Sequence, residues 1–155
     1  MKALVYEEYC KKTTEGAPDD DYKKILQVKE IDDPKPKPDE VVFKVKAAAL
    51  NYNDIWGMRG EPVPVPLPHV SGSDAAGDVI AVGDEVLNIK VGDRVVSHSN
   101  MSCRVCEACT GGREFDCAKR TIWGFQTGPN WGAFSEITHL PEVNIAKIPD
   151  SVSYN

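Results

Sequence analysis

Residues 77–98 read GDVIAVGDEVLNIKVGDRVVSH, and this stretch decides the fold class. Val and Ile dominate two short runs, residues 77–82 and 94–98, and β-branched side chains favour extended strands. Val91-Gly92-Asp93 separates the two runs, and glycine beside aspartate is typical of a tight turn. The stretch therefore predicts two strands joined by a turn.

The flanking sequence predicts further short strands. Residues 1–6, 41–47, 133–140 and 143–148 are rich in β-forming side chains, and residues 25–31 half alternate between apolar and polar types. Prolines interrupt the chain after this last segment, and we expect it to pair with residues 41–47 as a hairpin. Many short strands with turns between them favour a small antiparallel barrel.

Helices are expected to be few and short. Residues 51–59 are the best candidate, because Asn53 or Asp54 can cap the first amides and Gly60 can end the helix. Residues 7–24 carry mixed charges, Gly and Pro without an apolar period, and this pattern predicts a surface loop. The fold class is therefore mainly β with short helices.

Length and composition limit the functions open to this chain. Its 155 residues, 41% of them hydrophobic, suffice for one ordinary core, so we predict a single domain over residues 1–155. A net charge of -6 and the absence of a basic stripe argue against nucleic acid as a partner. No apolar run is long enough to cross a bilayer, and Glu7 and Glu8 arrive before a signal-type apolar core forms. We expect a cytoplasmic protein with no membrane partner.

A cluster of cysteines gives the strongest chemical signal. Cys103-x-x-Cys106-x-x-Cys109 is followed after seven residues by Cys117. Four thiolates from one compact lobe match the needs of tetrahedral Zn²⁺, whereas two disulfides, four free thiols or an iron-sulfur cluster are the alternatives. Because all four ligands come from the protein, no position is left for water or substrate. We predict a structural zinc in a lobe of about residues 97–128.

Several motifs around this cluster resemble the N-terminal half of zinc-type alcohol dehydrogenases. The motifs are Gly72-Ser73-Asp74-Ala75-Ala76-Gly77, Val79 to Gly83, Val91-Gly92-Asp93-Arg94-Val95 and Gly132-Ala133-Phe134-Ser135-Glu136. This resemblance to the medium-chain dehydrogenase/reductase superfamily spans nearly the whole chain. It implies a GroES-like antiparallel barrel with a projecting zinc lobe.

The second half of these family members is a Rossmann domain that binds NADH or NADPH. No Gly-x-Gly-x-x-Gly motif occurs in residues 1–155, so the resemblance implies that the cofactor is held mainly by a domain outside this chain. The cofactor-binding residues are therefore unknown from this sequence, and the chain's own Rossmann domain is an expected partner. We expect the chain alone to be inactive.

Zinc-catalytic family members carry a Cys at the position matched by Asn51 and a His at the position matched by Ser73. An amide and a hydroxyl cannot replace a thiolate and an imidazole as ligands of Zn²⁺. The resemblance therefore implies a reaction without catalytic zinc. His69, His98 and His139 do not keep the family spacing, and we assign them no catalytic role.

Two segments narrow the resemblance toward enoyl-thioester reductases and crotonyl-CoA carboxylase/reductases. They are Asn51-Tyr52-Asn53-Asp54-Ile55-Trp56 and Ile122-Trp123-Gly124-Phe125-Gln126-Thr127. The resemblance implies an NAD(P)H-dependent enoyl-CoA reductase for acryloyl- or crotonyl-CoA, homo-oligomeric at full length. In such a reaction negative charge spreads onto the thioester oxygen as an enolate, and this oxyanion needs a preorganised hydrogen-bond donor.

Asn51 is the first candidate for this donor and Tyr52 the second, while Trp56, Phe125 and Gln126 are expected to bind the substrate. Asn51 could equally serve as a helix cap, and Tyr52 could instead be a packed aromatic residue without a role in the reaction. Gln126 lies where carboxylating relatives carry Glu, so we expect the enzyme to carboxylate poorly.

Other functions remain open on the sequence alone. The Asn-Tyr-x-Asp pattern at residues 51–54 is similar to quinone oxidoreductases, so a quinone or enone reductase is the second hypothesis. An alcohol dehydrogenase-like protein and a zinc-stabilised barrel without catalysis are two more. The chain stops where family members lead into the cofactor domain, which we interpret as truncation, and the length of the native protein distinguishes these cases.

Overall fold

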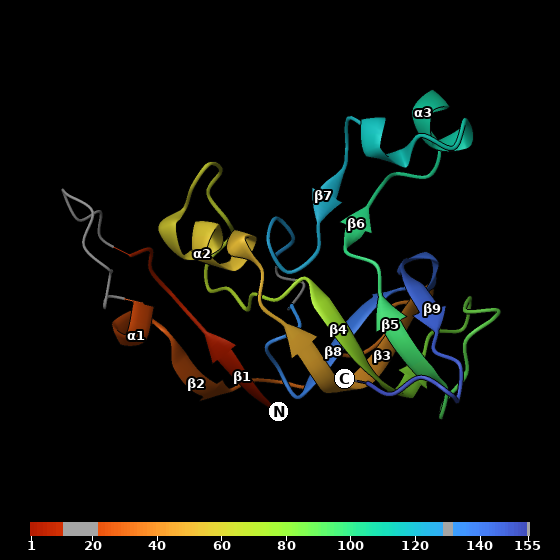
Figure 1. Ribbon diagram of the computed structural model, residues 1–155, viewed down its shortest axis with the longest axis horizontal. Helices are drawn as coiled ribbons and strands as arrows, with labels where there is room; N and C mark the ends of the chain where they lie inside the picture. Colours follow the sequence, from red (N-terminus) through yellow and green to blue (C-terminus); the bar gives the residue numbers. More distant parts are fainter. Residues whose placement is uncertain (11–21, 129–131, 155) are drawn as a thin grey trace.

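The computed structural model describes residues 1–10, 22–128 and 132–154. Its centre is a curved, antiparallel five-stranded sheet in the order β8-β3-β4-β5-β9 (Figure 1). The strands are β3 (Glu40–Ala49), β4 (Asp74–Val82), β5 (Arg94–Ser97), β8 (Ile137–Pro141) and β9 (Ile145–Lys147). The predicted class, mainly β with an antiparallel barrel-like sheet, is confirmed.

The strand-turn-strand unit predicted from residues 77–98 forms the middle of this sheet. Gly77 of β4 lies opposite Val95 of β5, and Gly92 in the connecting turn has a φ of 91°, which favours glycine. A Cβ at Gly77 would lie 2.0 Å from the carbonyl oxygen of Lys44 on β3. Glycine at this position therefore permits the close approach of the two strands.

The main core lies on one face of the sheet. Phe43, Val95, Leu140 and Trp123 are at most 1% exposed and belong to one hydrophobic cluster. Burial of a large apolar side chain contributes about 1.5–3 kcal/mol to stability. Because Trp123 follows the cysteine lobe in sequence, this core fixes the base of the lobe to the sheet.

A second, two-stranded sheet pairs β1 (Lys2–Val5) with β2 (Gln27–Glu30) in antiparallel register. The predicted hairpin between residues 25–31 and 41–47 is therefore wrong, since β3 pairs with β4 and β8 instead. Strand β1 lies farther from β2 in sequence than β3 does, and tertiary packing selected β1 as the partner of β2 over β3.

The predicted loop over residues 7–24 is partly wrong, because α1 (Tyr22–Ile25) begins within it. Ile25 of this helix is buried in a second hydrophobic cluster with Tyr6 and Met58, and this packing stabilises the turn of helix. Residues 11–21 of the predicted loop lie outside the described residues.

Helix α2 (Tyr52–Arg59) confirms the predicted short helix, and it ends at Gly60, whose φ is 66°. The first capping position is Asn51, with extended backbone angles, which confirms the alternative prediction of Asn51 as a helix cap, whereas the expected caps Asn53 and Asp54 lie inside the helix. The carboxylate of Asp54 instead accepts the backbone N–H of Asn51 at 2.8 Å, so it serves from the third helical position.

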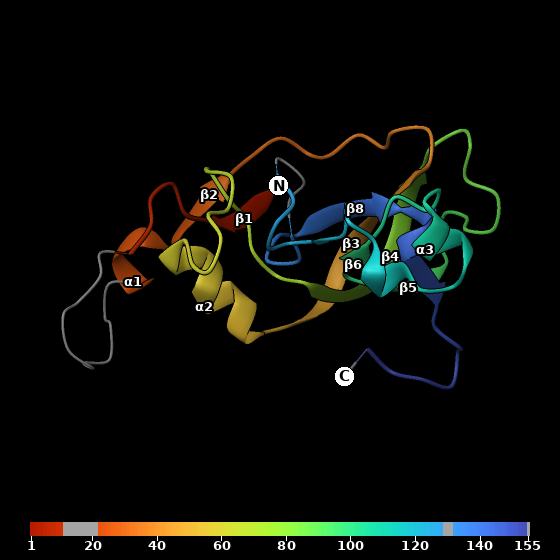
Figure 2. The ribbon, with the colours of Figure 1, turned by 90° about the horizontal axis from the view of Figure 1, so that it is seen from above.

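The cysteine lobe leaves the sheet through β6 (Asn100–Met101) and returns through β7 (Thr121–Ile122), which pair with each other. Between them lie α3 (Glu107–Thr110) and the 3-10 helix η1 (Glu114–Asp116). Figures 1 and 2 show α3 at one end of the molecule and α2, beside β1 and β2, at the other.

The loop between β4 and β5 is held by η2 (Glu142–Asn144), a 3-10 helix that follows β8. The carboxylate of Glu142 accepts the backbone N–H groups of three consecutive residues, Leu87, Asn88 and Ile89. Among the residues with described structure, no helix combines the length and apolarity of a membrane span.

Candidate functional site

The four predicted metal ligands converge in the lobe. The sulfur atoms of Cys103, Cys106, Cys109 and Cys117 all lie within 4.8 Å of one another. Three sulfur pairs are separated by 3.5, 3.6 and 3.9 Å. A disulfide requires about 2 Å, whereas a tetrahedral ion with Zn–S bonds of about 2.3 Å implies sulfur separations of about 3.8 Å. The arrangement fits a four-sulfur metal site and contradicts disulfides within the cluster.

The electrostatics of the cluster also favour a cation. Backbone N–H groups of Val105 and Cys106 lower the pKa of Cys103 to about 6. The backbone N–H of Cys109 acts in the same sense on Cys106, but the neighbouring thiols of Cys109 and Cys103 raise the pKa of Cys106 to about 11. Thiolates this close repel one another, and a soft divalent ion such as Zn²⁺ removes that repulsion.

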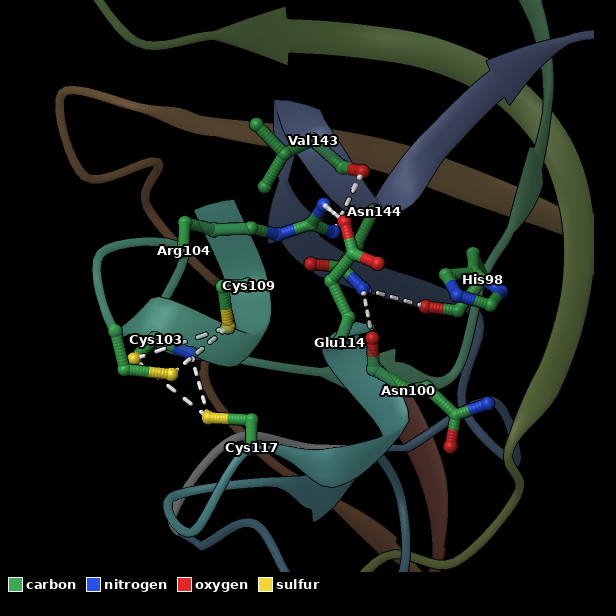
Figure 3. A network of polar contacts seen from close by, with 10 residues as sticks. His98, Asn100, Cys103, Arg104, Cys109, Glu114, Cys117, Val143 and Asn144 are labelled. Carbon is green, nitrogen blue, oxygen red and sulfur yellow. Dashed lines mark hydrogen bonds and ion pairs between the residues drawn. The ribbon is translucent and has the colours of Figure 1, made fainter. Parts of the chain in front are cut away.

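Polar contacts connect the lobe to the barrel (Figure 3). The buried amide of Asn144 donates to the carbonyl oxygens of His98 at 2.8 Å and Asn100 at 2.9 Å. Arg104, with a φ of 62°, donates to the carbonyl of Val143 at 3.4 Å. These contacts fix the entry of the lobe against the η2 segment.

A second group of candidate residues lies at the start of α2. Asp54 is 2% exposed, and its carboxylate accepts the backbone N–H of Asn51 at 2.8 Å and that of Gly72 at 3.0 Å. Burial raises the pKa of Asp54, although these two N–H groups oppose the shift. The carboxylate therefore holds together the two segments that carry Asn51 and Ser73.

The side chains of these segments also interact. The Asn51 amide nitrogen donates to a carboxylate oxygen of Asp74 at 2.6 Å, and the Asn53 amide nitrogen donates to the hydroxyl of Ser73 at 2.8 Å. A primary amide has two N–H donors, so Asn51 keeps one for a further acceptor. Asn51 thus occupies the capping position while its side chain is directed to Asp74.

A cavity of about 230 Å³ adjoins α2. Its lining comes from β1 and the residue after it, the residue before β2, α2, and the loops before α2, before β4 and before β8: Leu4, Tyr6, Leu26, Leu50, Asn51, Tyr52, Asp54, Ile55, Met58, Ser71 and Phe134. We call it the α2 cavity. The sequence pattern indicated only Asn51 and Tyr52, because the apolar walls come from segments far apart in sequence and carry no local motif.

Of the predicted site residues, Asn51 and Tyr52 line the cavity, whereas Trp56, Phe125 and Gln126 do not. Tyr52 is 63% exposed, and its ring packs edge-on against that of Trp56 at 5.3 Å between centroids. Phe125 is buried in the hydrophobic cluster behind the cavity, and the Gln126 side-chain oxygen accepts the backbone N–H of Ile122 at 3.1 Å. The substrate-binding roles of Trp56, Phe125 and Gln126 remain predictions.

Two histidines serve as packed polar residues. His69 is 1% exposed and lies 3.1 Å from the carbonyl oxygen of Gly124, while His139 is buried 2.9 Å from a carboxylate oxygen of Glu40. Neither lines the α2 cavity.

The barrel-like sheet with its projecting four-cysteine lobe is the architecture of the GroES-like domain of the alcohol dehydrogenase family. The alcohol dehydrogenase GroES-like domain matches residues 37–150, and the chain belongs to this family.

Individual relatives include a reductase and several dehydrogenases. The crotonyl-CoA carboxylase/reductase of Cereibacter sphaeroides is 37% identical over 145 residues, which cover 90% of this chain and 32% of that protein. An alcohol dehydrogenase of Geobacillus stearothermophilus is 33% identical over 134 residues, covering 85% of this chain and 39% of that protein. The chain thus spans about a third of the length of these relatives.

A solved structure of an NAD-dependent alcohol dehydrogenase superposes with a TM-score of 0.85 at 37% identity. The superposition covers 99% of this chain and 41% of that one. The predicted GroES-like fold and the medium-chain superfamily are both confirmed.

Proposed function

We propose that this chain is the substrate-side domain of a nicotinamide-dependent reductase that reduces an enoyl-CoA thioester without a catalytic zinc. One observation carries the proposal. The Asp54 carboxylate holds Asn51 next to the Gly72-Ser73 segment. The family resemblance matches Asn51 and Ser73 to the positions where zinc-catalytic members carry Cys and His, and the proximity of the two segments supports this match. The similarity to a crotonyl-CoA carboxylase/reductase supports the choice of substrate class.

A reduced nicotinamide, held mainly by the Rossmann domain that the family resemblance implies, would supply a hydride to the β-carbon of the substrate. Negative charge then develops on the thioester oxygen. The second N–H of the Asn51 amide donates to this oxygen, while Asp74 accepts the first and fixes the direction of the amide. One such donor stabilises a transition state by about 3 kcal/mol, which corresponds to roughly a hundredfold in rate.

Other side chains of the site support this reaction. Tyr52, an exposed residue that lines the α2 cavity, offers its hydroxyl as a second donor, and its contact with Trp56 fixes the ring. The cysteine cluster holds a structural zinc that stabilises the lobe and takes no part in the reaction. Protonation of the enolate by water completes the reduction.

The test is an assay of the full-length protein with crotonyl-CoA and acryloyl-CoA, with NADH and NADPH in parallel. Asn51→Ala should lower kcat about a hundredfold with little change in KM, because its donor acts on charge that appears only in the transition state. Asn88→Ala, at an exposed asparagine of the β4–β5 loop, is the matched control. An enzyme inert toward thioesters but active on quinones or alcohols contradicts the proposal.

An alcohol-oxidising enzyme is the second candidate, because the G. stearothermophilus relative and the superposed structure are both alcohol dehydrogenases. The same assay with short primary and secondary alcohols distinguishes the two. Activity on alcohols that is lost on chelation would favour the second candidate.

A further inference from the structure

The burial of its lining residues distinguishes two ends of the α2 cavity, a mouth that opens to solvent and a closed end. Leu50 is 83% exposed and Tyr52 is 63% exposed, so this end opens to solvent beside Asn51. Tyr6 and Met58, at 0% and 6% exposed, form the closed end. The cavity therefore runs from the candidate oxyanion donor into the second hydrophobic cluster.

The polar groups described at the closed end already have partners within the protein. The Tyr6 hydroxyl and the Ser71 hydroxyl lie 3.4 Å apart and hydrogen-bond to each other. Both carboxylate oxygens of Asp54 are occupied by backbone N–H groups. A ligand with a polar tail would lose its hydration here for at most one hydroxyl donor in return, whereas an apolar tail loses no hydrogen bonds.

The size of the cavity suits a short hydrocarbon chain. An apolar cavity of about 150 Å³ holds a benzene-sized molecule, and the α2 cavity has about 230 Å³. The side walls are Leu26, which lies between α1 and β2, and Ile55 of α2, and both side chains are half-buried and apolar. A chain of a few carbons thus fits between the mouth and Met58.

We propose that the α2 cavity binds the acyl chain of the substrate, with the thioester at the mouth beside Asn51 and the tail directed to Met58. This inference rests on the proposed function and deepens it. Leu26, Ile55 and Met58 then determine the acyl length that the enzyme accepts, and Phe125 acts only as the packing behind them.

The binding test uses the 155-residue chain with labelled Leu, Ile and Met methyl groups, followed by NMR. The probes are the butyryl and octanoyl thioesters of N-acetylcysteamine. We expect the methyl signals of Leu26, Ile55 and Met58 to shift with saturation, while that of Leu87, which is 85% exposed on the β4–β5 loop, stays in place.

Two variants change the cavity in opposite directions. Leu26→Phe fills it and should weaken binding of butyryl thioester at least tenfold, whereas the same replacement at Leu87 should leave binding unchanged. Met58→Ala lengthens the cavity and should raise the preference for octanoyl over butyryl about tenfold, both in binding and in kcat/KM of the full-length enzyme. Thermal unfolding verifies that each variant is folded.

The outcomes separate this inference from the proposed function. Probes that shift none of the three methyl signals overturn the acyl site, as does a folded Leu26→Phe variant that binds like the parent. A full-length enzyme inert toward enoyl thioesters overturns the proposed function. If the probes still bind in that case, the α2 cavity is an acyl-binding site whose ligand is not an enoyl-CoA substrate. Turnover of enoyl thioesters with an unchanged chain-length preference in Met58→Ala overturns the acyl site alone.

Discussion

Replacement of Asp54 by alanine should separate the two segments of the α2 site. The change leaves the backbone N–H groups of Asn51 and Gly72 without an acceptor. An unsatisfied buried donor costs about 1–3 kcal/mol. Burial raises the pKa of Asp54 because burying its charge is unfavourable, so removing the carboxylate offsets part of this loss of stability. We expect the free energy of unfolding to fall by about 3 kcal/mol, and Tm by roughly 6–12 °C in a domain of this size.

Urea denaturation measures this change, with Asp54→Asn and Asp74→Asn as companions. Asp54→Asn keeps an oxygen for one N–H but turns an amide nitrogen toward the other, so about half of the loss should remain. Asp74 is exposed, and its replacement should change stability by less than about 0.5 kcal/mol. An Asp54→Ala variant as stable as the parent would refute the role of the carboxylate.

The pH dependence gives an independent check. The pKa of Asp54 is raised above its ordinary value of 3.8, mainly by burial, so the folded state binds this proton more tightly than the unfolded state. Its contribution to stability is then greatest at low pH and declines as pH rises from that ordinary value through the folded-state pKa. The stability of the parent relative to Asp54→Asn should therefore fall with rising pH in this window, and a rising difference would contradict the assignment.

Three further results are expected. Elemental analysis should find one zinc per chain, lost in Cys106→Ser and retained in Cys10→Ser; a content near zero or two in protein purified without chelators would contradict the single structural site. Titration of NADPH fluorescence with the 155-residue chain should show no saturable binding, and micromolar affinity would refute the assignment of the cofactor to another domain. The full-length enzyme in saturating bicarbonate should yield mainly reduced product. Gln126→Glu should raise the carboxylated fraction, since Glu keeps an acceptor for the backbone N–H of Ile122 and adds a titratable group. Mainly carboxylated product from the parent enzyme would argue against this role of Gln126.

Local patterns in the sequence predicted the features that depend on local chemistry. The spacing of Cys103 to Cys117 was sufficient to predict the cluster, because thiolate ligands and tight turns are set by nearby residues. Gly60 and Gly92 likewise marked the end of α2 and the turn before β5, since both adopt positive φ values.

Features that depend on long-range packing could not be predicted in this way. The partner of β2 is β1 and not β3, a choice made by the packing of both strands and invisible in the pattern of residues 25–31. The α2 cavity combines Leu4, Leu26 and Phe134, which carry no motif and meet only after folding. Asn51 was predicted as the cap of α2 only as an alternative, and the other prediction, Asn53 or Asp54, was wrong because Asp54 acts from inside the helix through its side chain.

The contact of Glu142 with the β4–β5 loop has a consequence for hydrogen exchange. Three successive amides, at Leu87, Asn88 and Ile89, share one acceptor that lies more than fifty residues later in the chain. Burial of the Glu142 carboxylate raises its pKa, but these N–H groups lower it further than burial raises it. Although the loop lies at the surface, its amides should exchange slowly and together, and their protection should disappear as one unit when Glu142 is protonated in acid.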